Sequence, residues 1–308
     1  MTAEPRTLAI VGPTATGKSA VALGIAADFR AEIVCVDSMT VYRGVDVGTA
    51  KPTAADRARV RHHLLDLAEP NETFTVARFQ AEARTAIEGI AARGSTPLLA
   101  GGSGLYFRAV VDELRFPPAD AAVRAGLQAR PLAELRALLV RRDRVAAAAI
   151  EAGNARRIVR ALEVIELTGR PFSSFRDEWE RHAPGVLVAG LDLPAEPLRE
   201  RIRARLEGML EAGLLDEVRV LVERGFREAL TASQAAGYRE ALALIDGRID
   251  RAGFLEAATR STVRLAKRQR RWFAADPRVR WFDATELERA GEEVRAYLRG
   301  SLVGSGRA

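Results

Sequence analysis

Short apolar runs alternate along most of the chain with longer segments of helical periodicity. The runs predict five buried strands, at residues 8–11, 33–36, 97–100, 187–193 and 279–282. Helical spacing follows the first run over residues 19–29. It returns over residues 75–93, where Gly94 supplies a stop signal. Strand and helix in alternation predict an α/β fold with a parallel sheet, flanked by helices on right-handed crossover connections.

The pattern changes after Pro117 and Pro118. Residues 119–181 are rich in alanine and arginine, have helical periodicity and lack a strand pattern, so they predict a helical insertion. Beyond the fourth run, helices are expected over residues 197–224, 231–271 and 284–298, and a loose tail over 300–308. The expected division is therefore a first core part (1–116), the insertion (117–186), a mostly helical second core part (187–299) and the tail (300–308).

Composition excludes several classes of protein. Of the 308 residues, 48% are hydrophobic and 29% charged, which argues against a disordered chain. No apolar run approaches the roughly 20 residues of a membrane helix, and the first residues lack a signal-peptide pattern. A single cysteine, Cys35, excludes an internal disulfide framework and a multi-cysteine zinc site. We therefore expect a cytoplasmic protein with no membrane partner.

The charge balance is basic. Lysine and arginine total 47 against 41 acidic residues, giving +6, which is compatible with a nucleic-acid partner. Only three of the 47 are lysines: Lys18, Lys51 and Lys267. In so arginine-rich a chain, a lysine either marks a site that needs a compact ammonium group or remains there by chance.

Residues 12–19 fit the phosphate-loop motif G-x-x-x-x-G-K-[ST] between a predicted strand and a predicted helix. The candidate phosphate-binding residues are Gly12, Pro13, Thr14, Ala15, Thr16, Gly17, Lys18 and Ser19. Backbone N–H groups and the helix N-terminus would face phosphate oxygens, and Lys18 would reach the terminal phosphates. The Ser19 hydroxyl would bind Mg²⁺, the one cofactor expected. The motif indicates phosphate without specifying the compound.

Two further polar residues follow predicted strands. Asp37 comes after the second run, and Ser103 follows the third through Gly101 and Gly102. Ligands of parallel sheets bind beyond the carboxyl ends of the strands, so both side chains are expected near the phosphate loop. Asp37 is the lone strand-end acid of these first strands. It is a candidate Mg²⁺ partner or general base, and a turn cap is the simpler alternative.

Asp37 also opens a long distinctive block, Asp-Ser-Met-Thr-Val-Tyr-Arg-Gly-Val-Asp-Val-Gly-Thr-Ala-Lys-Pro. Further blocks follow in order at residues 62–66, 101–107, 156–163, 237–239 and 265–269. Together they closely resemble the signatures of the tRNA dimethylallyltransferases, also called isopentenyl-diphosphate:tRNA transferases. The resemblance extends from residue 8 to about residue 283, and all three lysines lie within its motifs. It implies a P-loop NTPase-like core with a helical tRNA-binding insertion.

The resemblance also implies a reaction. The family transfers a dimethylallyl group from its diphosphate to the N6 amine of the adenosine beside the anticodon, in tRNAs that read codons starting with U. The phosphate loop and Mg²⁺ would hold the leaving diphosphate, while Lys18 and Arg239 neutralise its charge. Asp37 would accept the amine proton. Ser103 would hydrogen-bond near the transferred carbon or the amine, in place of the threonine usual in the family.

The same resemblance implies that the adenosine is flipped out and that the partner is the tRNA anticodon stem-loop. We expect the protein to bind it as a monomer. The implied tRNA-binding residues are Asp37, Ser38, Met39, Thr40, Ser103, Arg124, Arg156, Arg157, Ile158, Val159, Arg160, Gln234, Gly237, Tyr238 and Arg239. Thr40 departs from the glutamine often found there. Arg156 and Arg160 lie one helical turn apart and share a face, although a solvated arginine face is the plain alternative.

Two rival functions use the same phosphate loop. A small-molecule kinase would bind ATP there, and an ATP-dependent RNA-binding module would bind RNA without changing it covalently. The block at residues 37–52 favours the transferase, because neither rival accounts for it. Whether ATP binds productively is left open by the sequence.

Overall fold

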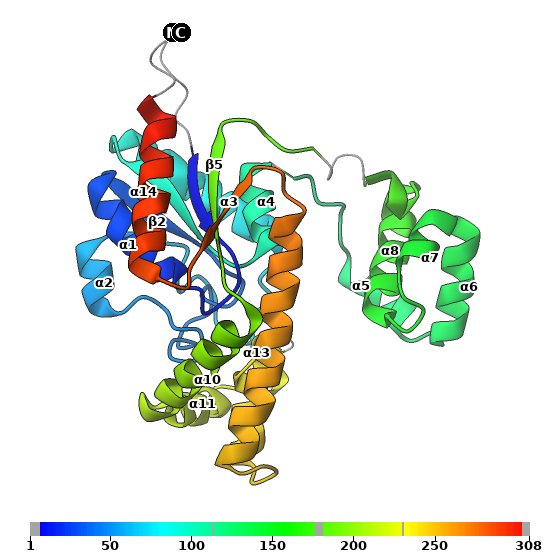
Figure 1. Cartoon of the computed structure of the whole chain (residues 1–308). Helices are drawn as coiled ribbons and strands as arrows, with labels where there is room; N and C mark the ends of the chain where they lie inside the picture. The colour runs from blue at the N-terminus through cyan, green and yellow to red at the C-terminus, as the bar shows by residue number, and fades with distance from the viewer. Residues whose placement is uncertain (1–6, 113, 176–180, 230, 304–308) are drawn as a thin grey trace. The chain divides into compact units, whose positions relative to one another are not determined.

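The computed structural model describes residues 7–112, 114–175, 181–229 and 231–303 (Figure 1). Within them, six strands form one parallel sheet in the order β3-β2-β4-β1-β5-β6. They are β1 (Thr7–Val11), β2 (Ala31–Val36), β3 (His62–His63), β4 (Thr96–Gly101), β5 (Val186–Asp192) and β6 (Val279–Asp283). The predicted fold class, a parallel sheet flanked by helices, is confirmed. Five strands lie where apolar runs predicted them, and β3 was missed because two residues carry no pattern.

The register of the central strands brings their carboxyl ends together. Val11 of β1 and Val36 of β2 both pair with Gly101 of β4, so the three following loops open at one edge of the sheet. These strands are almost wholly buried, which explains their continuous apolar runs. The edge where they end is where a ligand crevice is expected.

The crossover helices cover both faces of the sheet. The connection from β1 to β2 contains α1 (Lys18–Asp28), and the connection from β2 back to β4 contains α2 (Ala54–Arg59) and α3 (Val76–Ala92). The two connections run in opposite directions across the sheet, so right-handed crossovers place α1 and α3 on opposite faces. α14 (Leu287–Val303) packs on α1, and α4 (Gly104–Val111) packs on α3.

The helices between β5 and β6 lie mostly beyond the carboxyl edge of the sheet, and α13 runs from there back alongside it (Figure 1). They are α10 (Ala195–Glu211), α11 (Leu214–Glu223), the 3-10 helices η2 (Phe226–Glu228) and η3 (Ala232–Gln234), α12 (Tyr238–Ile245) and α13 (Arg251–Ala274). The pattern over 197–224 predicted one helical stretch, which the structure interrupts at Gly213, with φ +93°. α14 runs to Val303, so residues 300–303 are helical rather than loose, and residues 304–308 lie outside the described part.

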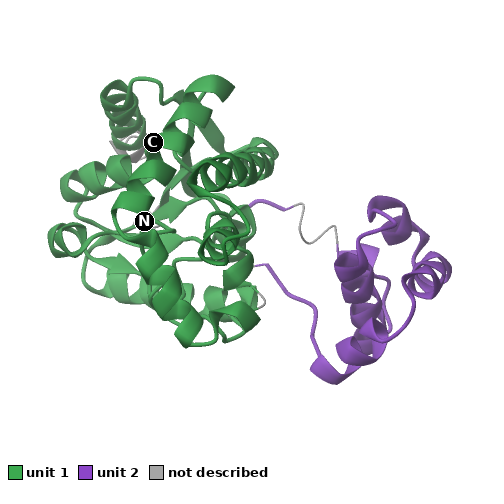
Figure 2. Cartoon of the chain, turned by 90° about the horizontal axis from the view of Figure 1, so that it is seen from below, with its two compact units in different colours: residues 1–111, 183–308 green, residues 112–182 purple. Residues whose placement is uncertain are grey.

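The chain divides into two compact units, residues 1–111 with 183–308 and residues 112–182 (Figure 2). The described part of 112–182 contains helices and no strand: α5 (Ala121–Gln128), α6 (Leu132–Arg142), α7 (Arg144–Ala149), α8 (Ala155–Thr168) and η1 (Phe172–Phe175). This unit has its own apolar core, in which α5, α6 and α7 contribute side chains that pack with those of α8. None of the helices in the described ranges is both long and apolar enough for a membrane span.

Candidate active site

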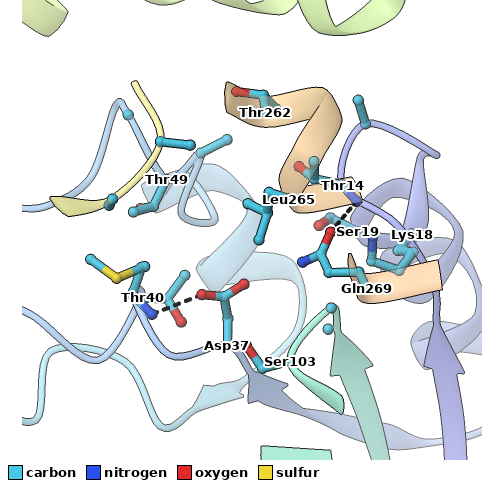
Figure 3. A pocket seen from close by; sticks show the side chains of 18 of the residues that line it. Thr14, Lys18, Ser19, Asp37, Thr40, Thr49, Ser103, Thr262, Leu265 and Gln269 are labelled. Atoms are coloured by element: carbon cyan, nitrogen blue, oxygen red, sulfur yellow. Dashed lines mark hydrogen bonds between the residues drawn. The ribbon is translucent and has the colours of Figure 1, made fainter. Parts of the chain in front are cut away.

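A cavity of about 710 Å³ opens at the carboxyl edge of the sheet. Its walls come from the phosphate loop, the loop after β2, the loop after β4, and the helical segments α10, η3 and α13. Figure 3 shows Lys18 and Ser19 on one side of this space and Asp37 and Ser103 on another. The structure thus brings together residues that are far apart in the sequence.

The phosphate loop is held in a tight curl. Gly12 has φ +136°, and a Cβ there would lie 2.2 Å from the Leu191 carbonyl oxygen, so only glycine fits. The Thr16 hydroxyl donates to the Pro13 carbonyl at 2.9 Å, and the Lys18 ammonium donates to the same oxygen. Helix α1 begins at Lys18, so the positive N-terminal end of this helix faces the cavity. Five of the eight predicted loop residues line the cavity: Thr14, Ala15, Gly17, Lys18 and Ser19.

Lys18 and Arg205 concentrate positive charge on this side. Burial, and then the nearby Arg205 guanidinium, lower the pKa of Lys18 to about 7, against the opposing effect of Asp37. Arg205 donates to the Thr14 hydroxyl and to the Thr49 carbonyl, each at 3.3 Å. It therefore connects the phosphate loop to the loop after β2, and both charges favour an anionic ligand between them.

Asp37 and Ser103 lie together at the strand ends, as predicted. The Met39 N–H donates to Asp37 Oδ1 at 2.8 Å, and the Ser103 hydroxyl oxygen accepts from the Ser38 N–H at 3.1 Å. Burial raises the pKa of Asp37 above its ordinary value. The Thr40 hydroxyl nearby is buried without a hydrogen-bond partner. A fixed carboxylate of raised pKa suits a proton acceptor.

The sequence analysis named Lys18 and Arg239 as the cations of the site and did not single out Arg205, which lines the cavity. The Arg239 side chain is 55% exposed, pairs with Glu240 at 2.7 Å and is absent from the cavity wall. Arg205 lies on the face of α10 that also carries Ile202, Leu206 and Met209. A charged residue within an apolar stripe at helical spacing was the available signal, which the arginine-rich composition obscured.

The predicted tRNA-binding residues of the larger unit divide into two sets. Those that line the cavity are Asp37, Ser38, Met39, Thr40, Ser103, Gln234 and Tyr238. Gly237 is buried and Arg239 lies outside the cavity wall. Tyr238 is fully buried, and its hydroxyl donates to Glu217 at 2.5 Å.

The insertion residues also differ from one another. Arg124 and Arg160 both pair at 3.0 Å with the buried Glu163, and Arg160 also donates to the Pro117 and Pro118 carbonyls. Ile158 and Val159 are buried in the core of the insertion, so their side chains do not face a partner. Arg156 and Arg157 are exposed. The shared face of Arg156 and Arg160 is therefore not a uniform solvated surface.

The loop after β2 is held from two sides. The Glu217 carboxylate accepts the backbone N–H groups of Asp46, Val47 and Gly48 at 2.9, 2.6 and 3.3 Å. On the other side, the buried Lys51 ammonium binds the Asp46 and Asp66 carboxylates at 2.6 and 2.7 Å. These contacts fix the segment that brings Gly48 and Thr49 to the cavity.

Two of the three lysines therefore sit where a compact ammonium is needed. Lys18 lies in the phosphate loop, and Lys51 reaches the Tyr42 carbonyl and two carboxylates at once. Lys267 is exposed on α13.

The described residues contain no group of three or more His, Cys, Asp or Glu side chains that could hold a metal ion. A metal site built from protein side chains alone is therefore not indicated in this part of the chain. The Ser19 hydroxyl is exposed and lines the cavity. That donor fits Mg²⁺, which retains waters and takes its remaining oxygens from substrate phosphates.

A model of the family described as IPP transferase matches residues 40–276. The chain belongs to this family. It is 51% identical over 290 residues to the tRNA dimethylallyltransferase of Kineococcus radiotolerans, covering 91% of each chain. It is 48% identical over 288 residues to that of Acidothermus cellulolyticus, covering 91% of this chain and 90% of the relative. Among solved structures, the chain is similar to the crystal structure of the tRNA isopentenylpyrophosphate transferase of Bacillus halodurans. The two sequences are 37% identical, and the structures superpose with a TM-score of 0.72 over 99% of both chains.

Proposed function

We propose that this IPP transferase family member moves a dimethylallyl group from dimethylallyl diphosphate to the N6 amine of the adenosine beside the anticodon of tRNAs that read codons starting with U. The products are N6-(dimethylallyl)adenosine and diphosphate. The observation that carries the proposal is one cavity with two chemically distinct sides. On one side are Lys18 of the phosphate loop and Arg205, which donates to Thr14 of that loop; on the other, Asp37 and Ser103 lie at the neighbouring strand ends.

The cationic side suits the leaving group. As the bond between the allylic carbon and oxygen breaks, negative charge grows on the diphosphate. The Lys18 ammonium, the Arg205 guanidinium and the loop N–H groups stabilise that charge. When bound, Mg²⁺ would add Lewis-acid stabilisation of the diphosphate oxygens, with Ser19 as its protein ligand.

The acidic side suits the nucleophile. The N6 lone pair forms the new C–N bond to the allylic carbon, and one amine proton must leave. Asp37 is oriented by the Met39 N–H, and its raised pKa makes it a stronger proton acceptor than an exposed aspartate. Ser103, held by the Ser38 N–H, supplies a hydroxyl beside the reacting amine. The unpartnered Thr40 hydroxyl is available to the incoming base.

The tRNA would reach this cavity by flipping the adenosine out of its stack. The anticodon stem-loop is the proposed partner, with Arg156 and Arg157 as exposed phosphate contacts on the insertion. The protein would act in the cytoplasm. We further propose a monomer.

The reaction is tested with dimethylallyl diphosphate, Mg²⁺ and unmodified tRNA, followed by mass measurement of the RNA. The proposal predicts addition of one dimethylallyl group at the adenosine beside the anticodon. Lys18→Ala should abolish most turnover and leave tRNA affinity nearly unchanged, whereas the exposed Lys267→Ala should behave as wild type. ATP consumption with a small acceptor would favour a kinase instead, and RNA binding with no mass change would favour a binding module.

A further inference from the structure

Gln269 of α13 accepts a hydrogen bond from a backbone N–H of the phosphate loop. The Thr14 N–H donates to Gln269 Oε1 at 2.8 Å (Figure 3). Because a backbone N–H can only donate, it is the amide oxygen, rather than the amide nitrogen, that faces the loop. The distance is that of a well-formed bond, so this N–H is satisfied by the protein and not directed at phosphate.

The amide is also held from its other side. A Cβ on Gly102, in the loop after β4, would lie 2.3 Å from Gln269 Nε2, so the amide group packs directly against this glycine. Gln269 is 8% exposed. Its head is therefore enclosed between the loop after β1 and the loop after β4, and it points into the space between Lys18 and Asp37 (Figure 3).

The position of Gln269 bears on how many phosphates the loop can hold. In phosphate loops that bind nucleoside triphosphates, backbone N–H groups surround the inner phosphates and the lysine reaches on to the terminal one. Here the loop retains the N–H groups that follow Thr14, together with Lys18 and Arg205. A further phosphoryl group beside Thr14 would meet an uncharged amide and lose a donor. Thr262, Leu265, Arg268 and Gln269 are the residues of α13 that line the cavity, and of these Gln269 is the one that bonds to the loop.

We infer that Gln269 is a specificity-determining residue: it limits the phosphate loop to a diphosphate and rejects a triphosphate. The inference rests on the proposed function, in which the bound group is a diphosphate ester. It gives a physical reason why a loop with a complete G-x-x-x-x-G-K-[ST] motif would not serve ATP.

The test compares inorganic pyrophosphate with inorganic tripolyphosphate, which differ by one phosphoryl group and carry no organic part. Their dissociation constants are measured by calorimetry on the full chain at fixed Mg²⁺. Wild type should prefer pyrophosphate. Gln269→Ala frees both the space and the Thr14 N–H, and should reduce that preference by about tenfold or more, the effect of one regained hydrogen bond to a charged group. Gln128→Ala, the same change at an exposed position of α5, should leave the preference unchanged.

Gln269→Glu provides an isosteric second variant. Its carboxylate still accepts a hydrogen bond from the Thr14 N–H but places negative charge where the extra phosphate would lie. The variant should therefore weaken the binding of tripolyphosphate at least tenfold more than the binding of pyrophosphate. Equal weakening of both ligands by Gln269→Glu, or an unchanged preference in Gln269→Ala, would overturn the inference. Transfer to tRNA is assayed separately. If the wild-type protein transfers the group to tRNA but the Gln269 variants keep the wild-type preference between pyrophosphate and tripolyphosphate, only the role of Gln269 is refuted. If the wild-type protein transfers nothing to tRNA, the proposed function is refuted.

Discussion

The low pKa of Lys18 predicts that diphosphate binding takes up a proton. Burial and the Arg205 guanidinium lower this pKa to about 7, so the free protein loses the Lys18 charge as the pH rises through that value. A bound diphosphate favours the ammonium and raises the pKa again. Affinity should therefore be highest below pH 7 and should fall above it.

The size of the effect follows from the charged fraction. With a pKa of about 7, Lys18 is charged in about 90% of molecules at pH 6 and about 10% at pH 8. If only that fraction binds well, the apparent dissociation constant rises about tenfold over the interval. Lys18→Arg is the control, because a guanidinium stays protonated throughout. The ligand and the other residues titrate alike in both proteins, so their contributions cancel in the ratio.

The assay is calorimetric binding of inorganic pyrophosphate at constant Mg²⁺ and ionic strength, from pH 6 to pH 8. The wild-type constant, divided by that of Lys18→Arg, should rise about tenfold across the range. Measurements at pH 8 in two buffers of different ionisation enthalpy should show more protons taken up per pyrophosphate bound in wild type than in Lys18→Arg. Parallel pH profiles for the two proteins would refute the argument from Lys18.

Two further predictions concern the surroundings of the site. Arg156→Ala with Arg157→Ala should reduce the salt dependence of tRNA binding by about one unit of slope per phosphate contact, whereas Arg160→Ala should leave the slope unchanged and lower the melting temperature. The reverse pattern in binding titrations would contradict these assignments. Glu217→Gln should lower the free energy of unfolding by about 1–3 kcal/mol and Tyr238→Phe by about 1 kcal/mol, measured by denaturant titration. Equal losses in the two variants would show that the backbone N–H contacts of Glu217 add nothing.

Much of the fold followed from local pattern. The apolar runs located β1, β2, β4 and β5 because these inner strands are covered on both faces, and they located the edge strand β6 through its short run at 279–282. The phosphate loop was identifiable because its chemistry fixes residue types at fixed spacing. The sequence pattern did not predict β3, because its two residues join the sheet only through pairing with β2. The break at Gly213 is a local feature, a glycine with φ +93°, that hydrophobic periodicity alone does not register, and the helical residues 300–303 carry no apolar period of their own.

The candidate site was predictable where a side chain follows a strand directly. Asp37 and Ser103 belong to loops at the edge where parallel strands end, so topology alone brings them together. Arg205 and Gln269 reach the cavity from helices far along the chain. Arg205 stands within an apolar stripe of α10, but that signal does not say which site it faces, and nothing local distinguishes Gln269 from a surface residue. Glu163 is a similar case. Its burial turns Arg124 and Arg160 into internal partners, and only the three-dimensional packing shows it.

The central claim is that Asp37 accepts the proton as the new C–N bond forms. The decisive measurement is single-turnover transfer to tRNA by Asp37→Asn across a series of Mg²⁺ concentrations, with the exposed Asp216→Asn as the matched control. A positioned base contributes about 10² to 10⁴ in rate, so the chemical step should slow by that order at every Mg²⁺ concentration, with diphosphate and tRNA binding little changed. Recovery of the rate as Mg²⁺ rises would identify Asp37 as a metal anchor and contradict the account.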